Sequence, residues 1–214
     1  DAVLPGGGLL RGGVVELCVT GAAAGATRIA LAACRAAQAE GRERGGDTPW
    51  CAFVDPSSSL FGPGVAETGV QLDRLLVVRP SLEALARVSL RVALSRAFAV
   101  VIVDTMGVPG SQVDLSLGTW PRVVRRLALA VESTQASVIV ITDSRALRPL
   151  PLPVAQRIEL SRPGEHELGV RVVKDKHGRI TSVRKIPWVQ PGPRPLVKTE
   201  PESLPRLVSN NRGP

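Results

Sequence analysis

The residues best suited to chemistry lie in the segment VTGAAAGATRIA, residues 19–30, between an apolar run and an alanine-rich run. A glycine-rich loop between a strand and a helix binds phosphates through its backbone N–H groups, with help from a lysine and a magnesium-binding threonine. Gly25 and Thr27 fit this pattern, but Gly21 falls one residue after the first glycine position, which Thr20 occupies, and Ala26 takes the place of the lysine. Because an alanine methyl carries no charge and no donor, the sequence predicts a degenerate phosphate loop.

A carboxylate follows another apolar run, VVIVD, which ends at Asp104. Asp104 and Thr27 are residue types that together can hold a magnesium ion beside a phosphate. The alternative is structural, with Asp104 ending a strand and Thr27 capping a helix. Both interpretations remain open at the level of the sequence.

The elements that would position these residues alternate along the chain. Short apolar runs rich in β-branched residues predict strands, and longer runs with apolar residues at helical spacing predict helices. Ser81 is in a position to cap the second helix, and Pro121 suits the first turn of the third. The predicted strands are 14–19, 50–55, 75–80, 99–104 and 137–142, and the predicted helices are 27–39, 81–96 and 121–133. This order predicts an α/β fold with a mostly parallel central sheet and helices on both faces.

The pattern changes after residue 150. The runs QRIELSR (156–162), GVRVVKDK (169–176) and RITSVRKI (179–186) are shorter and more alternating, which predicts a C-terminal antiparallel hairpin extension. From residue 187 the chain is rich in proline and polar residues. We therefore expect a core domain over 1–186 and a flexible tail over 187–214.

Composition limits the classes of protein. The 214 residues include 44% hydrophobic residues, which indicates a globular body. The net charge of +8 fits an acidic partner such as nucleic acid or an ordinary solvated surface, and aromatic residues, at 3%, are too few for a base-stacking platform. No apolar run is long enough to span a membrane, so no membrane contact is expected. The three cysteines lie in apolar stretches, which indicates buried thiols in the cytoplasm and no metal site.

Several segments together resemble the core of the RecA recombinase. They are LPGGGLLRGGVVEL (4–17), VTGAAAGATRIALAACRAAQAEG (19–41), WCAFVDPSSSL (50–60), VVIVDT (100–105) and VRVVKDK (170–176). The resemblance implies a RecA-like core in which Ser57 replaces the water-activating glutamate and Asp143 replaces the polar sensor of the γ-phosphate. Serine is a poor general base, and a carboxylate repels phosphate. With Ala26, these changes predict a protein that is not an enzyme and uses no cofactor.

Two segments resemble the ImuA family more narrowly: LPGGGLLRGGVVEL and VKDKHGRITSVRKIPW (173–188). That family consists of RecA-related accessory proteins of the bacterial DNA-damage-inducible mutasome, which serves translesion synthesis. The resemblance implies as partners RecA itself, ImuB, which is an inactive relative of Y-family polymerases, and indirectly an error-prone replicative-type polymerase.

A lysine pair is the candidate partner-binding feature. In the recombinase filament a K-x-K pair reaches the ATP held by the neighbouring subunit, and Lys174 and Lys176 match it here. Arg179 and Trp188 are further candidates for partner contact. The resemblance implies a protein that docks on a recombinase without offering an ATP site of its own, so that it caps the filament. The alternative is that these are ordinary surface lysines.

DNA contact is a weaker expectation. The recombinase binds single strands through loops after its fourth and fifth strands, and the matching segments here, 107–120 and 143–156, are short, the second being rich in proline. Arg122, Arg125 and Arg126 lie together on a predicted helix and are candidates for phosphate contact, or form a solvated helix face. The competing functions are a divergent ATPase that uses Arg28 for phosphate, and a plain DNA-binding module.

Overall fold

The structure is a computed structural model of the 214-residue chain, and it describes residues 4, 7–20, 25–106, 119–143 and 152–188. Its centre is an eight-stranded sheet in the order β3-β2-β4-β5-β1-β6-β7-β8. The strands are β1 (Gly13–Val19), β2 (Trp50–Val54), β3 (Leu75–Val78), β4 (Phe98–Asp104), β5 (Ser137–Asp143), β6 (Gln156–Gly164), β7 (Glu167–Asp175) and β8 (Arg184–Pro187). The five strands predicted before residue 150 are confirmed, each with ends within two residues of those expected.

The sheet is parallel from β3 to β6 and antiparallel from β6 to β8. The central strand β1 pairs with β5 on one side and β6 on the other, with Val15 opposite Ile139 and Gln156. Because parallel strands end at one edge, β1, β2, β4 and β5 all end at the carboxyl edge of the sheet. The predicted antiparallel extension is confirmed, although its third strand is confined to β8 and does not begin at residue 179.

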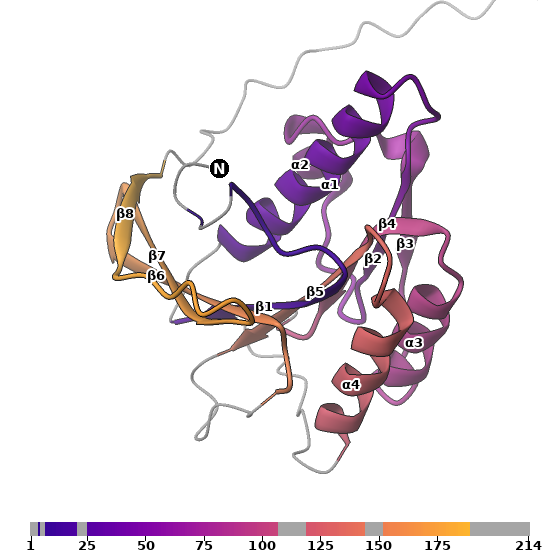
Figure 1. Ribbon diagram of the computed structural model, residues 1–214. Coiled ribbons are helices and arrows are strands. Elements are labelled where there is room, and N and C mark those ends of the chain that lie inside the picture. Colours follow the sequence, from indigo (N-terminus) through magenta and orange to yellow (C-terminus); the bar gives the residue numbers. More distant parts are fainter. Residues whose placement is uncertain (1–3, 5–6, 21–24, 107–118, 144–151, 189–214) are drawn as a thin grey trace, which may run out of the picture.

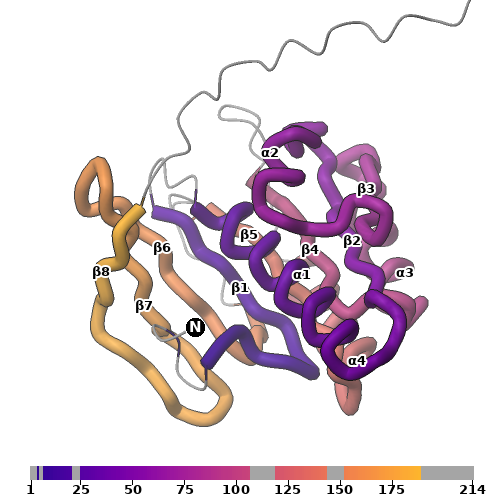
Figure 2. Tube along the Cα trace, turned by 90° about the horizontal axis from the view of Figure 1, so that it is seen from above, coloured from indigo at the N-terminus to yellow at the C-terminus, as the bar shows by residue number. Residues whose placement is uncertain are grey.

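Helices cover both faces of the sheet, as predicted. The helices are α1 (Gly25–Glu43), α2 (Gly62–Glu67), α3 (Leu85–Leu94) and α4 (Trp120–Val131), with a 3₁₀ turn η1 (Leu72–Arg74). Figure 1 shows α1 and α2 on one face and α3 and α4 on the other, and in Figure 2 α1 lies over the central strands. None of the helices among the described residues has the length and apolar character needed to cross a membrane.

The predicted start of α3 was wrong, whereas that of α4 was right. Pro121 lies in the first turn of α4, as expected. Ser81 does not cap α3, because residues 82–84 form a turn in which Ala84 N–H donates to Ser81 O at 3.0 Å. Leu82 on this turn is 54% exposed, whereas Leu85 is 1% exposed. The helix therefore begins where the chain first reaches the sheet.

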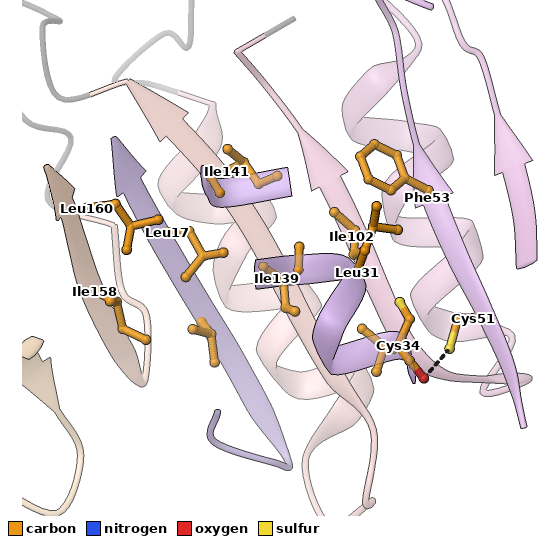
Figure 3. Packing of buried hydrophobic residues seen from close by; sticks show 14 of the residues in the cluster. Leu17, Leu31, Cys34, Cys51, Phe53, Ile102, Ile139, Ile141, Ile158 and Leu160 are labelled. Atoms are coloured by element: carbon orange, nitrogen blue, oxygen red, sulfur yellow. Dashed lines mark hydrogen bonds between the residues drawn. The ribbon is translucent and has the colours of Figure 1, made fainter. Parts of the chain in front are cut away.

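Two hydrophobic cores fill the spaces between the sheet and its helices. The core below α1 contains Leu17, Leu31, Phe53, Ile102 and Ile139, which Figure 3 shows interdigitating. The second core lies between the opposite face of the sheet and helices α3 and α4. The three cysteines, Cys18, Cys34 and Cys51, are free and buried, as predicted.

Candidate functional site

The start of α1 is the place where a phosphate loop would bind its ligand. Gly25 and Ala26 begin the helix and are buried, and Ala26, 3% exposed, packs into the core below α1. Thr27 is half-buried and lines a cavity of about 360 Å³ between α1 and α2. Gly21 lies outside the described residues. The position expected to hold a phosphate-binding lysine is therefore occupied by a methyl group that packs against apolar side chains.

Trp188 covers the first turn of α1. Its ring lies over the guanidinium of Arg28, with 5.2 Å from the Arg28 Cζ atom to the ring centroid. A Cβ atom on Gly25 would lie 3.4 Å from the Trp188 ring and 3.2 Å from Leu168. The backbone N–H of Trp188 also donates a hydrogen bond to the backbone carbonyl of His166 at 2.7 Å, which ties the end of β8 to the β6–β7 turn. The chain thus packs its own indole against the place where a phosphate would approach.

The structure places the boundary of the expected tail close to this contact. Pro187 ends β8, and Trp188, a candidate for partner contact, packs against the core below α1. Residues 189–214 lie outside the described residues. The flexible tail therefore stays a prediction.

Asp104 lies at the carboxyl edge as expected, at the end of β4 and 5% exposed. Its Oδ1 atom accepts a hydrogen bond from the Met106 N–H at 2.8 Å. Asp143 ends the neighbouring strand β5, half-buried, opposite Val19 at the end of β1. The topology thus brings both carboxylates and the start of α1 to one edge, and the contact with Met106 gives Asp104 a structural role in the turn after β4.

Asp55 organises the loop that contains Ser57, and sequence reasoning did not single it out. Asp55 is fully buried, and its carboxylate accepts hydrogen bonds from the N–H groups of Ser59 at 3.0 Å and Leu60 at 2.9 Å. The Ser57 hydroxyl donates to Asp55 Oδ1 over 3.4 Å. A carboxylate that accepts from backbone N–H groups a few residues ahead is a standard way to fix a turn. An aspartate directly after a buried strand and before three serines was the available signal.

The lysine pair lies beyond the other end of the sheet, around the end of β7. In the backbone register of the β6–β7 pair, Lys174 lies opposite Arg157. The backbone N–H of Lys176 donates a hydrogen bond to the backbone carbonyl of Ala155 at 2.8 Å. Both lysines are exposed, whereas Asp175 between them is buried. The two lysines therefore project from a strand end on either side of a buried carboxylate.

Asp175 holds this strand end in one conformation. Its carboxylate accepts hydrogen bonds from the His177 N–H at 2.8 Å, from Arg179 Nε at 3.2 Å and from Gln156 Nε2 at 3.2 Å. Burial by itself would raise the pKa of Asp175, but the hydrogen bonds from Arg179 and His177 outweigh it and hold the pKa below its usual value. Arg179, expected to contact a partner, is thus engaged within the chain.

The remaining candidates lie on α4 and in its neighbouring loops. Arg122, Arg125 and Arg126 lie on α4 with their side chains on the solvent side, and all three are exposed. Most of the two segments matched to DNA-binding loops, 107–118 and 144–151, lies outside the described residues. Among the residues that the structure describes, no three histidine, cysteine, aspartate or glutamate side chains gather as a metal site would require.

Comparison with known proteins supports the fold. No protein-family model matches the sequence, and a search of curated proteins finds no match. Among solved structures, one titled "Crystal structure of the RadB recombinase" is similar to the chain, with a TM-score of 0.65 and 19% identity. The likeness covers 85% of this chain and 90% of that chain. The fold is that of a RecA-like core, as the sequence predicted.

Proposed function

We propose that this chain is a non-catalytic RecA-like accessory factor in the DNA damage response, which binds a recombinase and restrains its filament. The observation that carries the proposal is a RecA-like core whose own phosphate position holds the buried Ala26. An exposed lysine pair is retained on the same core. The chemistry for meeting a phosphate is thus present on one surface and missing from the site that would hold one.

The start of α1 supports a protein without ATPase activity. A phosphate that approached the first turn of this helix would meet Ala26, which is buried, and the ring of Trp188. Neither side chain supplies positive charge. At the same edge the Ser57 hydroxyl donates to Asp55, and a serine hydroxyl is a poor general base for activating a water. We expect no meaningful ATP hydrolysis and little or no ATP binding.

The lysine pair supports docking on a phosphate held by another protein. A charged side chain loses less entropy on binding when its backbone is already fixed. Asp175 fixes the backbone between Lys174 and Lys176 through its bonds to His177 and Arg179. Two ammonium groups on a fixed strand end are suited to the outer phosphates of a nucleotide bound by a neighbouring subunit. A subunit that offers lysines but no ATP site ends a filament.

The narrower proposal places the protein in a translesion synthesis assembly. It rests on the resemblance of LPGGGLLRGGVVEL and VKDKHGRITSVRKIPW to the ImuA family. The partners proposed on this basis are RecA, ImuB and, indirectly, an error-prone polymerase. A pull-down of each purified partner by the full chain, with and without ATP and DNA, tests this assignment separately from the lysine mechanism.

The lysine mechanism is tested by the double variant Lys174→Ala/Lys176→Ala in a recombinase strand-exchange assay. We expect the wild-type chain to inhibit strand exchange and the double variant to lose most of that inhibition. The matched control is Arg171→Ala/Lys185→Ala, which removes two exposed positive charges from β7 and β8 but leaves the lysine pair intact. Equal inhibition by both double variants and the wild type would refute the lysine mechanism.

A divergent ATPase is the competing function, and it needs Arg28 to contact phosphate. The guanidinium of Arg28 lies over the Trp188 ring, so it would have to leave that ring first. Calorimetry with a non-hydrolysable ATP analogue and magnesium separates the two functions. We expect no saturable heat, and tight magnesium-dependent binding would favour the ATPase.

A further inference from the structure

Arginines gather on the solvent side of α3 and α4, on elements that the proposed function does not use. We define the arginine face as Arg87 and Arg91 on α3 together with Arg122, Arg125 and Arg126 on α4. All five of these arginines are exposed. Their spacing, i and i+4 on α3 and i, i+3 and i+4 on α4, places them along one stripe of each helix.

The two stripes face the same side of the molecule. Both helices bury their opposite stripes against one face of the sheet, through residues such as Leu85 and Leu90 on α3 and Val124 and Leu127 on α4. Each helix connects two parallel strands, so α3 and α4 run in the same direction, and they lie side by side (Figure 1). Arginines one helical turn apart are separated by about 6 Å along each helix, and packed helices lie about 8–10 Å apart.

Nothing within these helices neutralises the arginine face. Neither α3 nor α4 contains an aspartate or a glutamate. None of the face's arginines forms a salt bridge with another residue in the described part of the chain. Neither helix has an acidic residue in its first turn or a side-chain N-cap, so the helix dipoles add positive potential beside Arg87 and Arg122, whereas Arg91 lies in the last turn of α3.

We propose that the arginine face binds the phosphodiester backbone of nucleic acid without reading its sequence. A phosphate backbone offers single negative charges at regular short intervals, which matches rows of guanidinium groups. No aromatic side chain is exposed on either helix, since Trp120 is 5% exposed, so bases have nothing to stack on. The contact is therefore with phosphates, and the binding affinity falls as the salt concentration rises.

The distribution of apolar residues favours nucleic acid over an acidic protein segment. Leu94 and Leu129 are exposed, but each lies beyond the last arginine of its helix. Protein interfaces place apolar side chains in a central, desolvated patch with charges at the rim. On this face the leucines lie toward the C-terminal ends of the helices, past the arginines, which leaves no such centre.

The test measures fluorescence anisotropy of labelled single-stranded and duplex oligonucleotides of mixed sequence, titrated with the full chain. The variants are Arg87→Gln/Arg91→Gln and Arg122→Gln/Arg126→Gln. The control is Arg35→Gln/Arg42→Gln, which removes two exposed charges from α1 on the opposite face. Each variant lowers the net charge equally, and a thermal melt confirms that all three fold.

We expect both arginine-face variants to weaken binding clearly more than the control between about 50 and 200 mM salt. For duplex DNA, removing one phosphate-binding arginine reduces the slope of log affinity against log salt by about 0.9, so each double variant reduces it by up to about 1.8. Equal weakening in all three variants overturns the proposal. So does binding of polyglutamate, but of neither oligonucleotide, which would assign the face to an acidic protein. Because the lysine pair lies around the end of β7, neither result decides the proposed function.

Discussion

At the scale of single residues, buried carboxylates fix the local backbone and its neighbours. Glu16 in β1 is 2% exposed and accepts hydrogen bonds from Thr142 Oγ1 at 2.8 Å and Arg157 Nε at 2.6 Å. Asp55 and Asp175 likewise accept hydrogen bonds, from the backbone N–H groups of Ser59 and His177, and so fix the loops that follow them. A buried carboxylate is costly unless it is fully hydrogen-bonded, so each of these partners is needed for the acid to be tolerated.

The carboxylate of Asp175 predicts a dependence of stability on pH. Its folded-state pKa is lowered, so the ionised form stabilises the fold above the usual value of 3.8 and this contribution is lost as pH falls through the folded-state pKa. The change Asp175→Asn is expected to cost about 1–3 kcal/mol of unfolding free energy at neutral pH, because a charge-assisted set of hydrogen bonds is weakened. Urea unfolding of the wild type and the variant at neutral and acid pH measures both effects.

We expect the difference in unfolding free energy between the wild type and Asp175→Asn to become smaller below about pH 4. Glu167→Gln is the control, because Glu167 is a half-exposed partner of Lys185 and not a buried carboxylate. A difference that stays constant from neutral to acid pH would contradict the role of ionised Asp175.

At the scale of elements, the contact of Trp188 with α1 joins the end of the sheet to its first helix. Trp188→Ala is expected to destabilise the fold toward the low end of the roughly 3–5 kcal/mol typical of tryptophan truncation, because the side chain is half-buried. A double-mutant cycle with Arg28→Ala should give a coupling of about 0.5–1 kcal/mol, as expected for a cation–π pair at an exposed site. Equilibrium urea unfolding provides the free energies for the cycle.

The molecule supplies a matched control for this contact. Arg74 lies over the ring of Trp50, with 5.5 Å from its Cζ atom to the centroid, at a different edge of the sheet. Trp188→Ala is not expected to restore ATP binding, because Ala26 remains in the place of the lysine. A gain of ATP affinity in Trp188→Ala, absent from Trp50→Ala, would show that the indole and not the missing lysine closes the site.

The turn from α1 into β2 depends on a close approach at Gly41. A Cβ atom there would lie 2.4 Å from Cδ of Pro49, closer than atoms can pack. Gly41→Ala should therefore destabilise the fold by about 1–3 kcal/mol through overpacking, although alanine favours helix. Gly62→Ala in α2 meets no atom within 4 Å and serves as the control, with little or no loss expected. Thermal melts compare the two, and a Gly41→Ala protein as stable as the wild type would contradict the close approach.

Elements with a strong periodic pattern could be predicted from the sequence. Continuous β-branched runs such as residues 99–104 leave little choice but a buried strand, and their alternation with helices gives the RecA-like order. The short helix α2 and the start of α3 could not be predicted, because they are set by packing against the sheet and not by local pattern. The contact of Trp188 with Arg28 spans most of the chain, and no local signal encodes such a pair.

The candidate site was predictable to the extent that it follows strand ends. Asp104 and Asp143 lie where parallel strands place them, at the carboxyl edge. The role of Asp175 was not predicted, because its importance comes from partners on another strand and in the following turn. The sequence showed that the phosphate-binding lysine is missing at Ala26. Only the fold showed that Ala26 packs into the core and that the Trp188 ring lies beside Gly25 at the start of α1.

At the scale of the whole molecule, positive charge is found on more than one surface. The lysine pair lies around the end of β7, and the arginine face lies on α3 and α4. The net charge of +8 is thus distributed over separate elements, and the two proposals engage different parts of the fold. A variant in one surface should leave the activity of the other unchanged.

The position of β1 has a consequence for how the protein is made. This strand is the first to be synthesised among those described, yet its neighbours in the sheet are β5 and β6. Gly13 therefore cannot pair with Ser137 until the ribosome has synthesised Ser137. At about 5–20 residues per second, a ribosome needs roughly 6–25 s to reach that partner. Until then both sides of an apolar strand offer unpaired N–H and C=O groups, the template on which other chains aggregate. We therefore expect the nascent chain to need shielding from aggregation. The yield of folded protein in cells should depend more strongly on the supply of chaperones than the stability of the folded state alone would indicate.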